Sequence, residues 1–263
     1  MPRTDFRLSK WYVDCVGEDG ECAIAYHAEL SWGPIALGYA SLLRRGAANG
    51  TCSTISTIRA GPAPVTAPGY VAWDTPALEL RVTAQSHTAP FSHRLLEGTR
   101  GNVRWECVAP RAAVRMRCGS DFSLSGLGYA ERLEIDSRSL RLPIEQLRWG
   151  RFLTSTRAIV WIGWWGPEPR TLVFDDGRLQ DEAVIEDGAI RFGRSHLGLD
   201  RGALIRDAEL AEAIEPVARL LGPAAGNAAR THETKWLSRG TLHDPALAAP
   251  IEGWAIHELV VFP

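Results

Sequence analysis

Alternation of apolar and polar residues with a period of two dominates this chain of 263 residues. Such a period predicts β-strands, because successive side chains of a strand point to opposite faces. Residues 10–16 and 22–30 alternate on either side of the turn sequence GEDGE, which predicts a hairpin. Further strands are predicted at 35–43, 54–59, 78–83, 103–108, 112–118, 128–135, 158–165, 231–242 and 254–262. The pattern therefore predicts an all-β protein.

One segment departs from this pattern. Apolar residues recur at helical spacing from Leu210 to Leu221, Asp207 can cap the start, and a Gly-Pro pair follows the end. We therefore expect one short helix at 207–221.

A three-residue word, Gly-aromatic-Ala, occurs at 38–40, 128–130 and 253–255. Its presence near the ends of both halves suggests a β-unit that occurs twice, although so short a word has low specificity. We expect an N-terminal lipocalin-like half at 1–140 and a C-terminal one at 141–263, which contains the helix.

The charge and the cysteines narrow the class of protein. A formal net charge of −2 argues against a general nucleic-acid-binding protein, because such proteins carry a stripe of basic side chains on their surface. The five cysteines are odd in number and lack CxxC spacing, and no signal peptide is visible in MPRTDFRLSKW, so we expect reduced thiols and a cytoplasmic protein. No apolar run reaches the roughly 20 residues of a transmembrane helix. A homodimer is left open.

Ten tryptophans are an unusual excess. Large rings with a polar N–H suit a protein built around an apolar cavity, and their faces stabilise cations. The run at 158–165, AIVWIGWW, carries no charge on either face and is expected to be buried on both sides. The tryptophans expected to line a substrate cavity are Trp149, Trp161, Trp164, Trp165, Trp236 and Trp254.

The most informative segment is GLGYAERLEI at 126–135. In a strand, Tyr129 and Glu131 share one face with two aliphatic side chains, while Arg132 lies on the other face. A carboxyl group among apolar side chains keeps its proton to higher pH, as a general acid acting on an apolar substrate requires. The alternative is a structural glutamate that pairs with an arginine or caps a barrel end.

Two further acids have similar surroundings. Glu258 shares a face with Trp254 and Ile256, and Asp14 shares one with Tyr12 and Val16. Both are candidate catalytic groups. Lys235, in HETKW, lies on the face of Glu233, which favours an ion pair.

Other chemistries lack motifs. No GxSxG, Walker or GxGxxG sequence occurs in a strand-to-helix context, and the seven histidines show no HxH or HExxH spacing. We therefore expect no metal and no cofactor. His27 shares a strand face with Glu29 and is expected to be solvated.

Three segments resemble one family. The N-terminal KWYVDCVGEDGECAIAYHAELSWGPIALGYASL, the segment GLGYAERLE and the closing GWAIHELVVFP are similar to parts of the AttH / hydroxyneurosporene synthase (carotenoid 1,2-hydratase) family. The family's Tyr-x-Asp-His-x-Trp-Gly box is matched in part, with Tyr129 at its Tyr and Glu131 at its Asp. Arg132 replaces the His, and Trp149-Gly150 lies much farther along the chain.

This resemblance implies an all-β, lipocalin-like (calycin-type) fold with two packed antiparallel β-barrel or sandwich halves. Tocopherol cyclase and lipocalin-type Diels–Alderases belong to the wider superfamily. The implied activity is acid-catalysed hydration, cyclisation or isomerisation of an apolar isoprenoid or polyene. Glu131 would supply the proton, Tyr129 and the tryptophans would form the pocket walls, and Arg151 would hold a polar end of the substrate or tune the glutamate.

Three hypotheses remain open from the sequence. The first is this enzyme, and the second is a non-catalytic lipocalin-like carrier of a hydrophobic ligand, which needs the cavity but no acid within it. The third is a β-sandwich interaction module without a cavity.

Overall fold

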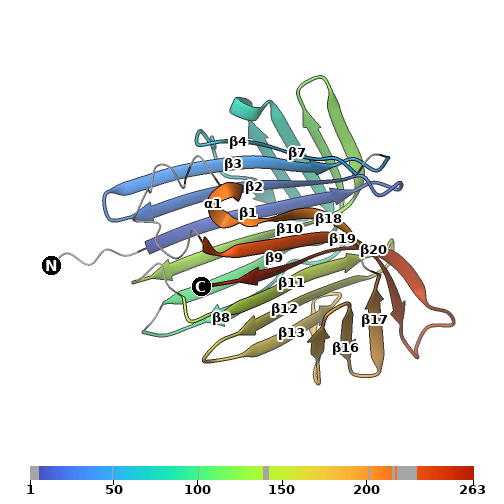
Figure 1. Ribbon diagram of the computed structural model, residues 1–263. Coiled ribbons are helices and arrows are strands. Elements are labelled where there is room, and N and C mark those ends of the chain that lie inside the picture. The colour runs from blue at the N-terminus through green and yellow to red at the C-terminus, as the bar shows by residue number, and fades with distance from the viewer. Residues whose placement is uncertain are drawn as a thin grey trace. The chain divides into compact units, whose positions relative to one another are not determined.

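The computed structural model describes residues 6–48, 50–99, 101–138, 142–200, 202–214, 217 and 230–263. These residues form two compact units (Figure 1): the first comprises Met1–Leu142 and Ile214–Ala225, and the second comprises Pro143–Ala213 and Gly226–Pro263. Among the described residues, α-helix occurs at α1 (Leu210–Ala213) and at Val217, and the rest of the regular structure is almost entirely strand. The all-β prediction is confirmed.

The first unit is built on one antiparallel ten-stranded sheet. Its strands are β1 (Phe6–Val16), β2 (Cys22–Trp32), β3 (Ile35–Arg45), β4 (Cys52–Thr57), β5 (Val65–Ala67), β6 (Tyr70–Thr75), β7 (Leu80–Ser86), β8 (Phe91–Leu96), β9 (Asn102–Cys118) and β10 (Phe122–Ser137). They pair in the order β4-β3-β2-β1-β10-β9-β7-β6-β5, and β8 also pairs with β9. A 3-10 turn, η1 (Pro76–Leu78), joins β6 to β7. The predicted first hairpin is β1 and β2.

The second unit has its own antiparallel ten-stranded sheet. Its strands are β11 (Gln146–Leu153), β12 (Ala158–Trp165), β13 (Arg170–Asp175), β14 (Arg178–Leu179), β15 (Val184–Glu186), β16 (Ala189–Phe192), β17 (Ser195–Leu199), β18 (Ala203–Glu209), β19 (His232–His243) and β20 (Ile251–Val261). They pair in the order β14-β13-β12-β11-β20-β19-β17-β16-β15, and β18 also pairs with β19.

The two sheets have the same strand order, since adding ten to each strand number of the first gives the second. The word Gly-aromatic-Ala lies on β10 and on β20, which hold the same place in their sheets. A Cβ on Gly128 would lie 2.0 Å from the carbonyl oxygen of Asp14, and one on Gly253 would lie 2.3 Å from that of Leu153. In both units the next residue, Tyr129 or Trp254, is the register partner of the residue that presents this carbonyl. The word therefore marks the same close strand contact twice.

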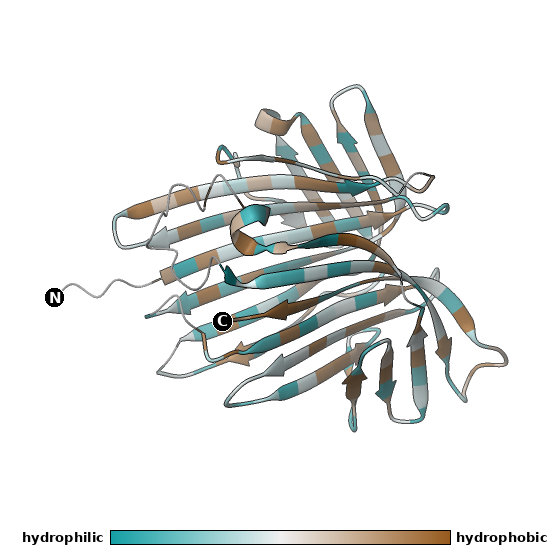
Figure 2. Ribbon diagram, viewed as in Figure 1, coloured by the Kyte–Doolittle hydropathy of each residue, from teal (hydrophilic) through white to brown (hydrophobic). Residues whose placement is uncertain are grey.

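Each unit has a hydrophobic core on one face of its sheet. In the first unit this core includes Val13, Leu42, Trp73 and Met116, and in the second it includes Phe152 and Trp161 as well as the side chains of β16 and β17. Figure 2 shows the brown and teal residues alternating along many strands, as the period of two predicts. The uncharged run of β12 is buried over nearly its whole length, which confirms that prediction.

The local pattern misplaced the start of the helix and the environment of His27. Residues 207–209 belong to strand β18, because Asp207, Ala208 and Glu209 pair with β19, and the helical residues described within 207–221 are Leu210–Ala213 and Val217. Most of 215–221 lies outside the described residues. His27 is 1% exposed rather than solvated, because it faces the core and stacks edge-on against Trp73. None of the helices among the described residues could span a bilayer.

Gly128→Ala should destabilise the first unit by about 3 kcal/mol, because the added Cβ meets the Asp14 carbonyl oxygen and lies 2.6 Å from Val114 Cγ2. Urea unfolding measures the loss. Gly198→Ala is the matched control, since its Cβ would meet only His196 Cε1, at 3.6 Å, and should change stability by less than about 1 kcal/mol. Equal effects of the two substitutions would refute the close-contact argument.

Candidate functional site

The sheet of the first unit carries a row of functional side chains on the face opposite its core. Tyr26 on β2 pairs in register with Tyr12 on β1, Tyr12 pairs with Glu131 on β10, and Glu131 pairs with Cys107 on β9. These four strands are two hairpins, β1–β2 and β9–β10, which come from distant parts of the sequence and meet where β1 pairs with β10. We call the surface formed by Tyr12, Tyr26, Cys107, Tyr129 and Glu131 the Tyr–Glu face. All five side chains are buried.

Glu131 is held by two hydrogen bonds to the same oxygen. Its Oε2 accepts one from Trp105 Nε1, at 2.5 Å, and one from the hydroxyl of Tyr129, at 2.7 Å. The side chain is 8% exposed. Two donors on Oε2 fix the orientation of the carboxyl group and stabilise the carboxylate that remains after a proton leaves. The nearest arginine in sequence, Arg132, instead pairs with Glu134 and lies over the Trp11 ring.

Cys107 extends this network beyond Tyr129, with which it shares a hydrogen bond. Burial raises the pKa of both groups well above their ordinary values, and nearby negative charge raises them further. Both groups are therefore protonated at neutral pH, and Cys107 is not a thiolate nucleophile.

Asp14 lies beside this network. It is fully buried on β1 and pairs in register with Tyr129, so it is a diagonal neighbour of Glu131 across the β1–β10 ladder. Diagonal neighbours lie roughly 7 Å apart, which is close enough for two carboxyl groups to act on one substrate. The structure thus brings together three predicted site residues, Asp14, Tyr129 and Glu131.

Aromatic rings surround the carboxyl groups. Tyr12 lies edge-to-face with Tyr26, at 5.4 Å between centroids, and with Tyr129, at 6.1 Å. Phe91 meets Trp105 in the same way, at 5.4 Å. The ring of Tyr26 already interacts with a cation, because Lys10 Nζ lies 5.3 Å from its centroid. This face can therefore stabilise positive charge.

Glu258, the third predicted acid, lies in the second unit and forms an ion pair with Lys235. Lys235 is 1% exposed and also pairs with Glu233, at 2.7 Å, which confirms the ion pair expected from HETKW. Glu233 in turn binds Arg206, at 3.3 Å. Glu258 therefore belongs to a buried network of alternating charges.

The predicted pocket residues of the second unit divide between the two faces of its sheet. Trp149, Arg151, Trp164, Trp254 and Glu258 share the face opposite the core. Trp161, Trp165 and Trp236 are on the core face, and the Trp161 ring covers Gly150 so closely that a Cβ there would lie 2.2 Å from it. Arg151 is fully buried and donates to the carbonyl oxygen of Trp254, at 2.9 Å. Within this unit the six tryptophans do not form one wall.

Sequence reasoning missed several residues of this chemistry. Tyr12 and Tyr26 reach Glu131 only through the pairing of the distant strands β1 and β10. Trp105 and Cys107 lie on β9, which a short turn joins to β10, and a register shift between these two strands next to Glu131 sets Cys107 opposite it. Trp105 and Cys107 do alternate onto one strand face, but nothing local assigns that face to Glu131. His257 was also missed. Its Nε2 lies 2.8 Å from Ser238 Oγ, its ring stacks on Trp236, and burial followed by the charge of Lys235 lowers its pKa to about 4.

Lys235→Met should destabilise the protein by about 3–5 kcal/mol, because it leaves the carboxylates of Glu233 and Glu258 buried without their shared cation. Chemical denaturation at pH 7 measures this loss. The control is Arg81→Met, which removes an exposed pair with Asp74 and should cost less than about 1 kcal/mol. A small effect at Lys235 would contradict the network.

His257 should make the protein less stable as the pH falls. The unfolded state takes up the proton near pH 6.5 but the folded state only near pH 4, so protons favour unfolding in this window. Between pH 7.5 and 5 this histidine should account for about 2 kcal/mol of lost stability. His257→Asn should lose that much less than the parent protein in urea titrations at the two pH values. Equal losses of stability in the parent protein and in His257→Asn would disprove the role of His257. His27, whose pKa burial also lowers, is present in both proteins and contributes equally to both losses.

No protein-family model matches the chain, and no curated protein matches it. Solved structures do match. Kievitone hydratase from Nectria haematococca superposes with a TM-score of 0.53 and 9% identity, covering 97% of this chain and 88% of that chain. CghA superposes with a TM-score of 0.54 and 8% identity, covering 99% of this chain and 89% of that chain.

An AttH-type protein from Nitrosomonas europaea gives a TM-score of 0.51 and 10% identity, with 99% of this chain and 93% of that chain covered. At such identities the likeness concerns the fold. The resemblance seen in the sequence is confirmed at that level: this chain has the fold of kievitone hydratase, CghA and the AttH-type protein.

Proposed function

We propose that this chain is an enzyme that hydrates, cyclises or isomerises an apolar isoprenoid or polyene, with Glu131 as the proton donor. The observation that carries the proposal is the pair of hydrogen bonds from Trp105 and Tyr129 to one oxygen of a buried carboxyl group. Such an arrangement orients the acid and favours the carboxylate formed when the proton leaves. The fold shared with hydratases is consistent with this chemistry.

The reaction would begin with transfer of the Glu131 proton to an alkene carbon. The π electrons form the new C–H bond, the O–H bond of Glu131 breaks, and a carbocation is left on the neighbouring carbon. The rings of Tyr12, Tyr26 and Tyr129 are placed to stabilise that cation by their faces. Burial keeps competing water away until the cation forms.

The fate of the cation would set the product. In hydration a water molecule adds through its oxygen and gives up a proton, and Asp14 is the carboxyl group placed to accept it. In cyclisation a second alkene of the same substrate adds instead, and the new cation would lose a proton from a neighbouring carbon to the Glu131 carboxylate. In isomerisation a C–H bond next to the first cation would give its proton to that carboxylate, and its electrons would form the moved double bond.

A second candidate is a carrier that binds the same kind of molecule without turnover. The buried aromatic surface of Tyr12, Tyr26 and Tyr129 favours it, because such a surface binds apolar molecules whether or not a proton is transferred. A carrier has no need for Glu131 to ionise.

Glu131→Gln separates these two functions. As an enzyme, the protein should lose roughly 10²–10⁴-fold in turnover, while the Kd for the ligand changes little, because the amide keeps the shape but cannot give a proton. The assay is incubation with polyprenoids and polyenes in oxygen-18 water, followed by mass spectrometry. Label in the product indicates hydration, and an unlabelled isomer indicates cyclisation or isomerisation.

Glu134→Gln is the matched control. Glu134 lies on the same strand but on the opposite face, where it is partly exposed and pairs with Arg132. Its turnover should equal that of the parent protein. The enzyme proposal would give way to the carrier if the parent protein and Glu131→Gln both bind the ligand and the parent protein returns it unchanged.

A further inference from the structure

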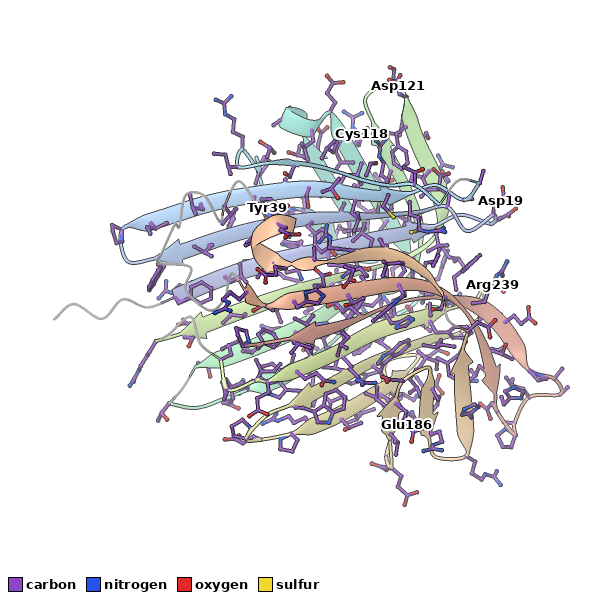
Figure 3. All side chains as sticks on the ribbon, in the orientation of Figure 1. Asp19, Tyr39, Cys118, Asp121, Glu186 and Arg239 are labelled. Atoms are coloured by element: carbon purple, nitrogen blue, oxygen red, sulfur yellow. The ribbon has the colours of Figure 1, made fainter. Side chains whose placement is uncertain are left out.

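The Tyr–Glu face continues onto β3 with a buried serine. Ser41 pairs in register with Tyr26, so Ser41, Tyr26, Tyr12 and Glu131 form one straight row across four neighbouring strands. Ser41 is 1% exposed. It is two residues beyond Tyr39, which Figure 3 labels, and its side chain lies on the same face of β3. The row therefore begins with a hydroxyl and reaches the Glu131 carboxyl group across two rings.

The hydroxyl of Ser41 has no hydrogen-bond partner among the described residues. A buried hydroxyl without a partner costs about 1–3 kcal/mol, so native proteins rarely retain one unless something outside the chain satisfies it. The core of the first unit does not need a hydroxyl at this position, since Ser41 points away from the core face that Ala40 and Leu42 occupy. A bound molecule could supply the hydrogen bond that the Ser41 hydroxyl lacks.

We propose that Ser41 binds a hydroxyl or carbonyl oxygen at one end of the substrate and thereby places the reacting alkene at Glu131. This inference rests on the proposed function and specifies its substrate. Ser41 is a positioning residue, because it would act on the far end of the molecule. The reacting proton stays with Glu131.

The row also sets a length. Adjacent strands are about 4.8 Å apart, so three strand steps separate Ser41 from Glu131 by about 14 Å along the sheet. Between them lie the rings of Tyr26 and Tyr12, which suit an apolar chain. Lys10, over the Tyr26 ring, adds a second polar group near the Ser41 end of the row. The substrate class is therefore an elongated terpenoid with one oxygen at its end and an alkene near the other end.

The probes are linear terpenoid alcohols of 10, 15 and 20 carbons and the hydrocarbons that lack the hydroxyl. Tryptophan fluorescence measures their Kd, and product formation gives KM and kcat. The 15-carbon alcohol, farnesol, should bind most tightly of the three alcohols, and more tightly than farnesene. In Ser41→Ala its Kd and KM should rise about 5–10-fold, with kcat within twofold, because one hydrogen bond is lost. Binding of farnesene should not change.

Ser56→Ala is the matched control, since Ser56 is the register partner of Ser41 on β4 and is exposed. It should leave all constants unchanged. Ser41→Ala removes only a buried hydroxyl without a partner, so it should unfold thermally at the temperature of the parent protein or above it, which confirms that it folds.

Equal loss of alcohol and hydrocarbon binding in Ser41→Ala, no loss of either, or no binding of any probe by the parent protein would overturn the proposal. Failure of the proposed function has a different signature. In that case the alcohol selectivity depends on Ser41, but Glu131→Gln changes neither turnover nor binding.

Discussion

The close approach of β10 to β1 is the constraint on which the candidate site depends. Gly128 lacks a Cβ where one would lie 2.0 Å from the Asp14 carbonyl oxygen, so the two strands can pair along their whole length. That pairing places Tyr129 opposite Asp14 and Tyr12 opposite Glu131. A slip of one residue would send every one of these side chains to the other face. The site is thus a consequence of register.

The same strand order supports different chemistry in the two units. On the face opposite the core, the first unit buries phenols, a thiol and carboxyl groups joined by hydrogen bonds. The second unit buries alternating charges, in which Lys235 lies between Glu233 and Glu258. Buried charges that neutralise one another in pairs are fixed by their partners, and such a network is suited to structure. A carboxyl group held by neutral donors, as Glu131 is, can exchange a proton without leaving an unpaired cation behind.

Several features of the chain could be predicted from local sequence. Alternation predicted the first hairpin and the uncharged buried strand β12, and it put Tyr129 and Glu131 on one face. The spacing in HETKW predicted the contact of Lys235 with Glu233. The predictions that were wrong concern residues whose environment is set by distant segments. His27 alternates with apolar residues as a solvated side chain would, but Trp73 and the carbonyl of Gly61 cover it.

The sequence by itself determined which side chains share a strand face, because the period of a strand is a local property of the backbone. It also determined the all-β class and the pairing of strands that a short turn connects. Only the tertiary structure decided that Tyr12 on β1 pairs with Glu131 on β10, and hence that Ser41 begins the row that ends there. Pairing between strands far apart in sequence depends on the packing of the whole sheet. The alternation of residues along one strand is the same whichever distant strand lies beside it, so it does not identify that strand.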